Sequence, residues 1–205
     1  MQATRLYFLG FLTLFLELAL IRYLSGNVWN MGYFPNLVLI AVFVGMGCGF
    51  LFHRLSNETV SRGLFACSVP LLLGLVLLIY FKRPVVPGFR TNFGKVGEEV
   101  YLTSISKTTE NVSLIPLIIL FALVVLLFVL ISQRTAKYFS KFAPLRAYGL
   151  DIAGSCTGII SFVIFSWFQL PPTIWFLILL VPFLILLETR IISKIILVMM
   201  LLAIT

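Results

Sequence analysis

The sequence predicts an all-α protein, a polytopic bundle of about seven transmembrane helices that forms a single domain over residues 1–205. Hydrophobic residues make up 61% of the chain and charged residues only 11%, and the mean hydropathy is +1.13. A soluble domain of this size needs more charge to cover its surface. The apolar runs are long and continuous rather than alternating, which indicates helices rather than membrane strands.

Each predicted helix corresponds to one apolar segment, because a bilayer core about 30 Å thick requires roughly 20 residues per helix. The expected segments are approximately 6–24, 34–53, 64–81, 113–132, 147–169, 173–187 and 191–205. The first carries Glu17 and no small-residue cleavage pattern, so we interpret it as a retained helix rather than a signal peptide. Residues 82–112 are rich in Gly, Pro and charge and predict a polar loop. The last segment stops at Thr205 with no polar closure, so we expect the chain to belong to something longer.

The net charge of +8 is spread over short segments between apolar runs. This pattern favours contacts with lipid headgroups over nucleic acid, so the lipid bilayer is the expected partner. With the N-terminus in the cytoplasm, nine Lys and Arg residues lie inside and six outside, most of the six in the loop 82–112. The bias predicts a multi-pass protein with a cytoplasmic N-terminus.

No catalytic, metal or cofactor site is predicted. Cys48, Cys67 and Cys156 lie in or near apolar runs without metal-ligand spacing, and the single histidine, His53, follows a helix. The segment Gly45-Met-Gly-Cys-Gly49 resembles a nucleotide-binding loop, but it lies within an apolar helix rather than after a strand. We therefore interpret it as a packing motif.

Glu17 is the most unusual residue, because its position about eleven residues into the first helix places it near the bilayer midplane. A charge there costs at least about 2.5–3.5 kcal/mol on insertion scales, so its side chain is expected to face the bundle. A structural role is favoured, with proton or cation movement as the alternative. Thr157 is a candidate partner, and Arg22 is expected to extend to the outer interface.

Asp151 is the second acidic residue in a predicted helix, five residues after Arg146. Its helical face also carries Gly154 and Gly158, whose spacing allows another backbone to approach closely. The second predicted helix offers the same spacing at Gly45 and Gly49. These four glycines are expected at helix–helix contacts, with Asp151 as a polar anchor.

Three runs carry a family resemblance: Leu16–Arg22, Leu37–Gly49 and Arg146–Gly158. They contain, in order, E-x-x-x-x-R, a Gly-rich helix and R-A-Y-x-x-D-x-x-G-x-x-x-G. The chain thereby resembles the N-terminal membrane domain of bacterial spermidine-synthase-like proteins, which are related to polyamine aminopropyltransferases. The resemblance implies the bacterial inner membrane. It also implies that Glu17, Arg22, Arg146, Asp151 and the glycines are a packing signature. In that family a soluble aminopropyltransferase-like domain usually follows the helices, and this chain contains no such domain.

Three classes of function compete. The favoured one is a non-catalytic membrane anchor, scaffold or accessory subunit within a larger protein or complex, for example a respiratory or photosynthetic one. Its expected partners are other membrane subunits or a soluble domain beyond Thr205. The alternative is a transporter of a small cationic solute such as a polyamine. A membrane enzyme is the third, and no recognisable site supports it.

Overall fold

The computed structural model describes residues 2–28, 35–82 and 115–187. These residues form six helices and no strand, which confirms the all-α class. The helices are α1 (Gln2–Asn27), α3 (Asn36–Phe52), α4 (Glu58–Lys82), α5 (Ile115–Phe139), α6 (Pro144–Trp167) and α7 (Pro172–Leu186). The expected number of about seven is not matched within the described residues, and the segment 191–205 lies outside them.

Four of the six helices are long and apolar enough to cross a membrane, namely α1, α4, α5 and α6. The apolar helices α3 and α7 are shorter, with 17 and 15 residues. At 1.5 Å per residue α3 is about 26 Å long, close to the thickness of the hydrocarbon core. The chain is therefore built from apolar helices that suit a multi-pass membrane protein.

Two predicted helix boundaries are wrong by six residues or more. Helix α4 begins at Glu58 rather than near residue 64, because an acidic residue stabilises the first turn of a helix. Helix α5 continues to Phe139 rather than ending near residue 132. Its last two turns are polar in sequence but buried in the fold, so hydropathy alone places the boundary too early.

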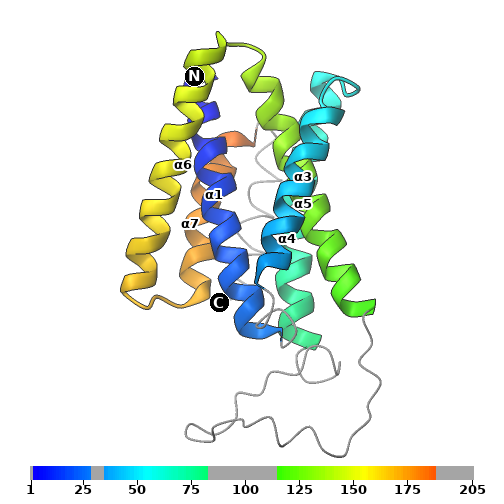
Figure 1. Ribbon diagram of the computed structural model, residues 1–205, viewed down its shortest axis with the longest axis vertical. Coiled ribbons are helices and arrows are strands. Elements are labelled where there is room, and N and C mark those ends of the chain that lie inside the picture. Colours follow the sequence, from blue (N-terminus) through cyan, green and yellow to red (C-terminus); the bar gives the residue numbers. More distant parts are fainter. Residues whose placement is uncertain (1, 29–34, 83–114, 188–205) are drawn as a thin grey trace, which may run out of the picture.

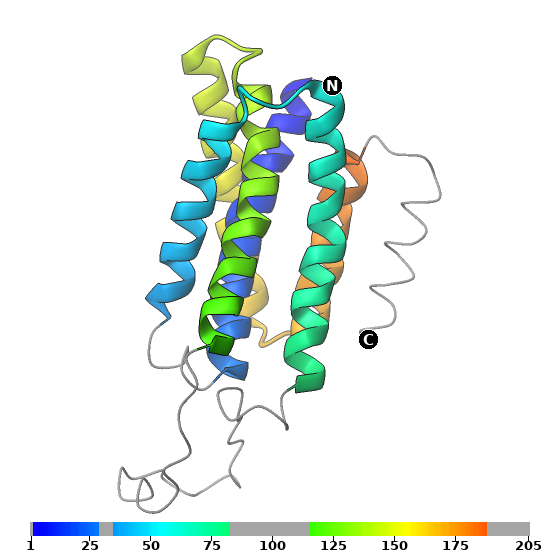
Figure 2. The ribbon, with the colours of Figure 1, turned by 90° about the vertical axis from the view of Figure 1, so that its right-hand side faces the viewer.

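The helices form two layers of three. In Figure 2 α3, α5 and α4 lie side by side in front, and α6, α1 and α7 lie behind them. Helices α5 and α1 are the central members, and α1 packs most extensively on α6 while α3 packs most extensively on α5. The core accordingly lies along α1, where Leu6, Leu9, Leu12, Phe15 and Leu16 are fully buried.

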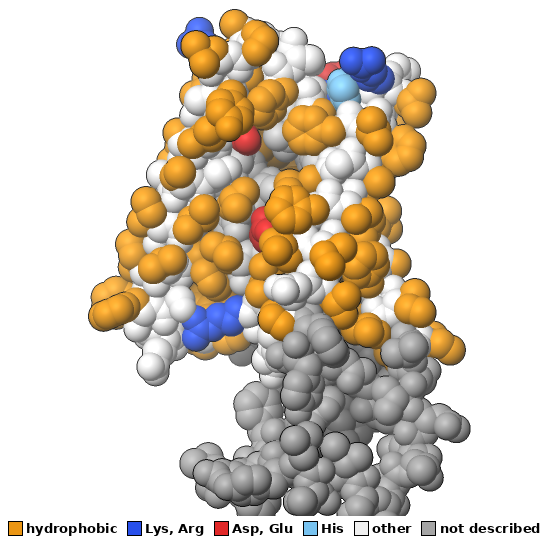
Figure 3. Space-filling view, in the orientation of Figure 1, with side chains coloured by type: hydrophobic (Ala, Val, Ile, Leu, Met, Phe, Trp, Pro, Cys, Tyr) orange, Lys and Arg blue, Asp and Glu red, His pale blue; other side chains and the backbone are white. Residues whose placement is uncertain are grey.

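On the face shown in Figures 1 and 3, α6 and α3 lie on either side of α1. We call this side of the bundle the α3–α6 edge. At the opposite edge α4 meets α7 through the rings of Phe65 and Phe183, whose centroids lie 5.7 Å apart. The N-terminus, the α3–α4 connection and the α5–α6 connection share one end of the bundle, which we call the N-terminal end.

Candidate functional site

The contact between α1 and α6 is a close approach of two backbones at glycine. A Cβ atom on Gly154 would overlap the carbonyl oxygen of Tyr7, and one on Gly158 would lie 2.8 Å from the carbonyl oxygen of Phe11. Contacts this short are sterically forbidden for a real side chain, so both positions require glycine. The spacing of four residues puts the two glycines on one face of α6, and that face lies against α1.

Helices α3 and α5 meet in the same way. A Cβ atom on Gly45 would lie 2.6 Å from the carbonyl oxygen of Val125, and one on Gly49 would overlap the hydroxyl oxygen of Ser132. Ser132 fills the notch that Gly49 leaves, and its hydroxyl lies 3.4 Å from the carbonyl oxygen of Gly45. The two glycine pairs therefore belong to two separate helix contacts, one in each layer.

Asp151 lies on α6 one turn before Gly154 and packs against a further glycine, Gly10 of α1. A Cβ atom on Gly10 would lie 2.9 Å from Oδ1 of Asp151 and 2.6 Å from its carbonyl oxygen. Because Gly10 has no side chain, the carboxyl group of Asp151 can pack directly against the backbone of α1. No described residue donates a hydrogen bond to this carboxyl group.

A small cavity of about 70 Å³ adjoins Asp151 beneath the α3–α6 edge. Four hydroxyl side chains line it together with the carboxyl group, and they come from α1, α5 and α6: Thr13, Ser132, Thr135 and Ser155. Met46 and Phe50 of α3 and Leu14 of α1 also line it. The cavity is thus lined by both oxygen-bearing and apolar side chains.

Glu17 lies near the middle of α1, and its side chain faces the bundle with 6% of its surface exposed. The expected partner is wrong, because the Thr157 hydroxyl instead accepts a hydrogen bond from Tyr7, at 2.8 Å. Among the described residues none forms a hydrogen bond with the Glu17 carboxyl group. Glu17 does not line the cavity beside Asp151.

The face at the α3–α6 edge shows how these groups are arranged. Figure 3 shows apolar side chains covering most of it, with basic side chains at both ends of the described part and acidic side chains in the strip between α6 and α3. Large apolar residues exposed on these two helices include Phe43 on α3 and Ile160 on α6. The acidic side chains of this strip thus lie among apolar side chains, between the basic ends.

Arg22 and Arg146 lie near opposite ends of the bundle. The Arg22 guanidinium lies 5.1 Å from the ring centroid of Trp175 and donates a hydrogen bond to the hydroxyl of Ser166. The guanidinium of Arg146 lies 5.9 Å from the ring centroid of Phe142 at the N-terminal end. Neither arginine is paired with Asp151 or Glu17 by a salt bridge in the described structure.

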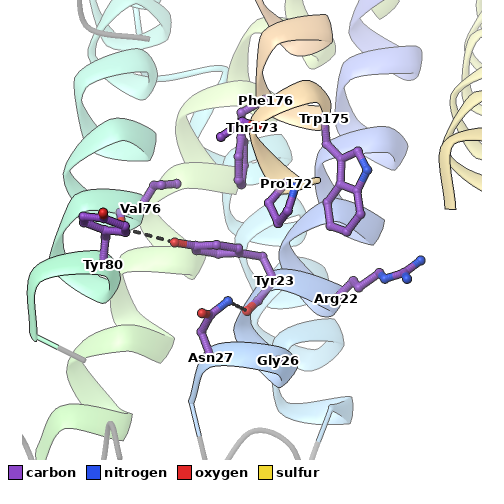
Figure 4. A pocket seen from close by; sticks show the side chains of 10 residues that line it. All are labelled: Arg22, Tyr23, Gly26, Asn27, Val76, Tyr80, Pro172, Thr173, Trp175 and Phe176. Atoms are coloured by element: carbon purple, nitrogen blue, oxygen red, sulfur yellow. Dashed lines mark hydrogen bonds between the residues drawn. The ribbon is translucent and has the colours of Figure 1, made fainter. Parts of the chain in front are cut away.

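Arg22 also borders a cavity of about 620 Å³ between α1, α4 and α7 (Figure 4). Aromatic side chains dominate its wall, and the hydroxyl of Tyr23 donates to the carbonyl oxygen of Val76, at 3.4 Å. Asn27 closes its lower side in Figure 4 and donates to the carbonyl oxygen of Tyr23, at 2.7 Å. This cavity lies at the end of the bundle away from the N-terminus.

A charged cluster at the N-terminal end was not predicted. Its centre is Arg134 of α5, which is 2% exposed and donates to Glu58 at 2.9 Å and to the hydroxyl of Tyr138 at 3.1 Å. Arg5 of α1 donates to the same hydroxyl, also at 3.1 Å. The other basic members are Arg62 and Lys141, both on Glu58, and Lys137, which donates to the carbonyl oxygen of Ser56.

This cluster joins α1, α4 and α5 around the carboxylate of Glu58 and the hydroxyl of Tyr138. Two signals for it exist in the sequence. Glu58 and Arg62 have the i,i+4 spacing of a helical ion pair, and Arg134 and Tyr138 have the same spacing. These basic residues indicate an orientation, but neither spacing reveals that Arg134 is buried.

The described residues contain no group of three or more His, Cys, Asp or Glu side chains that could hold a metal ion. Comparisons with family models, with curated proteins and with solved structures give no match to this chain. The assignment of a function therefore depends on the geometry of the residues themselves.

Replacing Gly154 by alanine is expected to destabilise the bundle by about 1–3 kcal/mol, because the added methyl group overlaps the Tyr7 carbonyl on α1. Gly149→Ala is the matched control on the same helix, since nothing lies within 4 Å of a Cβ atom there. The control should be neutral or slightly stabilising, because alanine favours helix. Thermal unfolding of the purified protein in detergent measures both. Equal effects at the two positions would contradict the close contact between α1 and α6.

Proposed function

We propose that the chain is a non-catalytic integral membrane domain that serves as an anchor or scaffold within a larger protein or membrane complex. One observation carries the proposal: the unusual small and polar residues of the sequence join helices to one another. Gly154 and Gly158 of α6 pack against α1, and Gly45 and Gly49 of α3 pack against α5. Lipid tails are as apolar as the helices, so such close contacts are what holds a membrane bundle together.

The outer surface supports the same proposal. The exposed faces of α3 and α6 are rich in large apolar residues, such as Phe43, Leu51, Ile160 and Val163. These faces can lie against lipid or against further transmembrane segments. The resemblance to spermidine-synthase-like membrane domains suggests a soluble aminopropyltransferase-like domain as the functional partner, and a subunit of a larger membrane complex is the other partner consistent with a scaffold.

We further propose the bacterial inner membrane as the location, with the N-terminal end in the cytoplasm. The described basic residues at that end are Arg5, Arg54, Arg62, Arg134, Lys137, Lys141 and Arg146. Positive residues favour the cytoplasmic side of a membrane. This support comes from the distribution of charge along the bundle.

Labelling of single cysteines is expected to reveal this orientation. Leu55 at the N-terminal end and Trp167 at the other end are 81% and 83% exposed, so a cysteine at either position is accessible. In a background without Cys48, Cys67 and Cys156, a membrane-impermeant maleimide applied to intact cells should label position 167 and not position 55. The reverse pattern would invert the topology. Labelling after cell lysis controls for accessibility.

The scaffold proposal predicts a stable assembly in native membranes. A tagged chain purified in mild detergent and measured by mass spectrometry of intact complexes should appear with at least one other polypeptide in fixed stoichiometry. A photoreactive residue at Ile160, on the exposed face of α6, tests whether that face carries the partner, and position 118 on the exposed face of α5 serves as the matched control. A chain recovered only as a monomer from native membranes would contradict the proposal.

Transport of a small cationic solute such as a polyamine is the second candidate. The specific observation in its favour is the carboxyl group of Asp151 at a polar cavity within the bundle, with the buried Glu17 elsewhere on α1. Acidic residues within a membrane often belong to ion or substrate pathways. Glu17 does not line the cavity beside Asp151, so the two carboxyl groups do not form one binding site there, and transport is therefore less well supported than the scaffold.

The variant Glu17→Gln separates the two candidates. A scaffold should keep its assembly and most of its stability, because the amide retains hydrogen-bonding capacity without a charge. A transporter should take up radiolabelled spermidine in proteoliposomes and lose that uptake in the variant while the protein still folds. Uptake by the wild type that Glu17→Gln abolishes would replace the scaffold proposal with the transporter.

A further inference from the structure

The cavity beside Asp151 is lined by five side chains that carry oxygen atoms, together with the apolar side chains of Leu14, Met46 and Phe50. Thr13 comes from α1, Ser132 and Thr135 from α5, and Asp151 and Ser155 from α6, so three helices converge on a space of about 70 Å³. A water molecule requires at least about 10–15 Å³ of such volume. The cavity therefore has room for an ion with a few water molecules and is small for an organic solute.

The hydroxyl groups of this lining face the cavity mainly as acceptors. Thr13 donates its single hydroxyl proton to the carbonyl oxygen of Leu9 at 2.8 Å, and Thr135 donates to that of Ile131 at 3.3 Å. Ser132 lies 3.4 Å from each of two backbone carbonyl oxygens. A hydroxyl has one proton and two lone pairs, so a hydroxyl that donates to its own helix still has lone pairs to offer.

The carboxyl group of Asp151 adds a negative charge to this set of acceptors. None of the described cavity residues is basic, and none donates a hydrogen bond to the carboxyl group. Gly10 leaves the space in which its Oδ1 atom lies against α1. A carboxylate in the apolar zone of a bundle is costly unless a cation or a donor accompanies it.

We propose that this cavity binds one partly dehydrated monovalent cation of the size of Na⁺, held by the Asp151 carboxylate and the hydroxyl oxygens of Thr13, Ser132 and Thr135. Oxygen ligands suit hard cations. A single carboxylate neutralises a single positive charge, whereas a divalent ion would leave a net charge in the apolar zone. The cation would tie α6 to α1 and α5, so the site goes beyond the scaffold function and does not depend on it.

Sodium-dependent stability of the full chain in detergent micelles or nanodiscs tests the proposal. The unfolding temperature is measured as NaCl replaces N-methyl-D-glucamine chloride at constant ionic strength, because the organic cation is too large for the cavity. Binding to the folded state alone should raise the unfolding temperature in a saturable way, by about 5–10 °C at a hundredfold excess over the dissociation constant. Direct binding of radioactive ²²Na⁺ gives a second readout at 25 °C.

Three variants complete the design. Asp151→Asn should abolish both the thermal shift and ²²Na⁺ binding, and Thr135→Val should weaken binding at least tenfold while preserving the shape of the side chain. Glu58→Gln is the matched carboxylate control, since Glu58 lies in the charged cluster away from the cavity. That control should keep the full sodium-dependent shift even if its starting unfolding temperature is lower.

Several outcomes would overturn the proposal. Equal unfolding temperatures in Na⁺ and in the organic cation, or an undiminished shift in Asp151→Asn, would show that no cation binds at this carboxyl group. Stabilisation by Mg²⁺ without stabilisation by Na⁺ would show that the site prefers a divalent ion, and would thereby overturn the assignment of a monovalent cation. Should Asp151→Asn fail to fold, unchanged ²²Na⁺ binding in Thr135→Val and in Thr13→Val would overturn the assigned ligands. None of these results depends on whether the chain assembles with a partner.

Discussion

Close contact between helix backbones is the interaction on which this bundle depends. Helices in lipid gain little by burying apolar side chains against each other, so their association relies on packing distance and on polar contacts. Glycine allows two pairs of helices to approach closely: α6 lies against backbone carbonyl groups of α1, and α3 lies against those of α5. Each contact belongs to one layer of the bundle. Each of the helices α1 and α5 therefore makes the closest contact within its own layer, and the two also contact each other at the centre of the fold.

The polar groups of the apolar zone follow from this arrangement. A helix that approaches closely at Gly154 brings the side chain one turn earlier, Asp151, against α1, and Gly10 accommodates it there. On the other layer, Ser132 occupies the notch at Gly49 and reaches the same cavity as Asp151. Small residues thus determine where polar side chains meet. The charged cluster at the N-terminal end works differently, because it joins α1, α4 and α5 through long side chains around Glu58 and Tyr138.

The sequence is sufficient to predict the helical class and the helix α3, whose expected range of 34–53 differs little from Asn36–Phe52. Hydropathy fails where polar residues are buried, as in the last turns of α5, because those side chains are satisfied by partners distant in sequence. The spacing of Gly154 and Gly158 predicts a close contact but not the helix that makes it. Depth along an ideal helix likewise cannot identify Tyr7 as the partner of Thr157, since that depends on the tilt and stagger of α1 and α6.

The order of synthesis adds a consequence to the pairing of α1 with α6. Tyr7 and Thr157 lie 150 residues apart in the chain, and the helices that carry them are neighbours in the finished fold. At a synthesis rate of about 5–20 residues per second, α1 leaves the ribosome roughly 8–30 s before its main partner. During that interval the midplane carboxyl group of Glu17 has no α6 beside its helix. Until α6 arrives, Glu17 on α1 therefore has to be shielded from lipid by the insertion machinery or by α3 and α5.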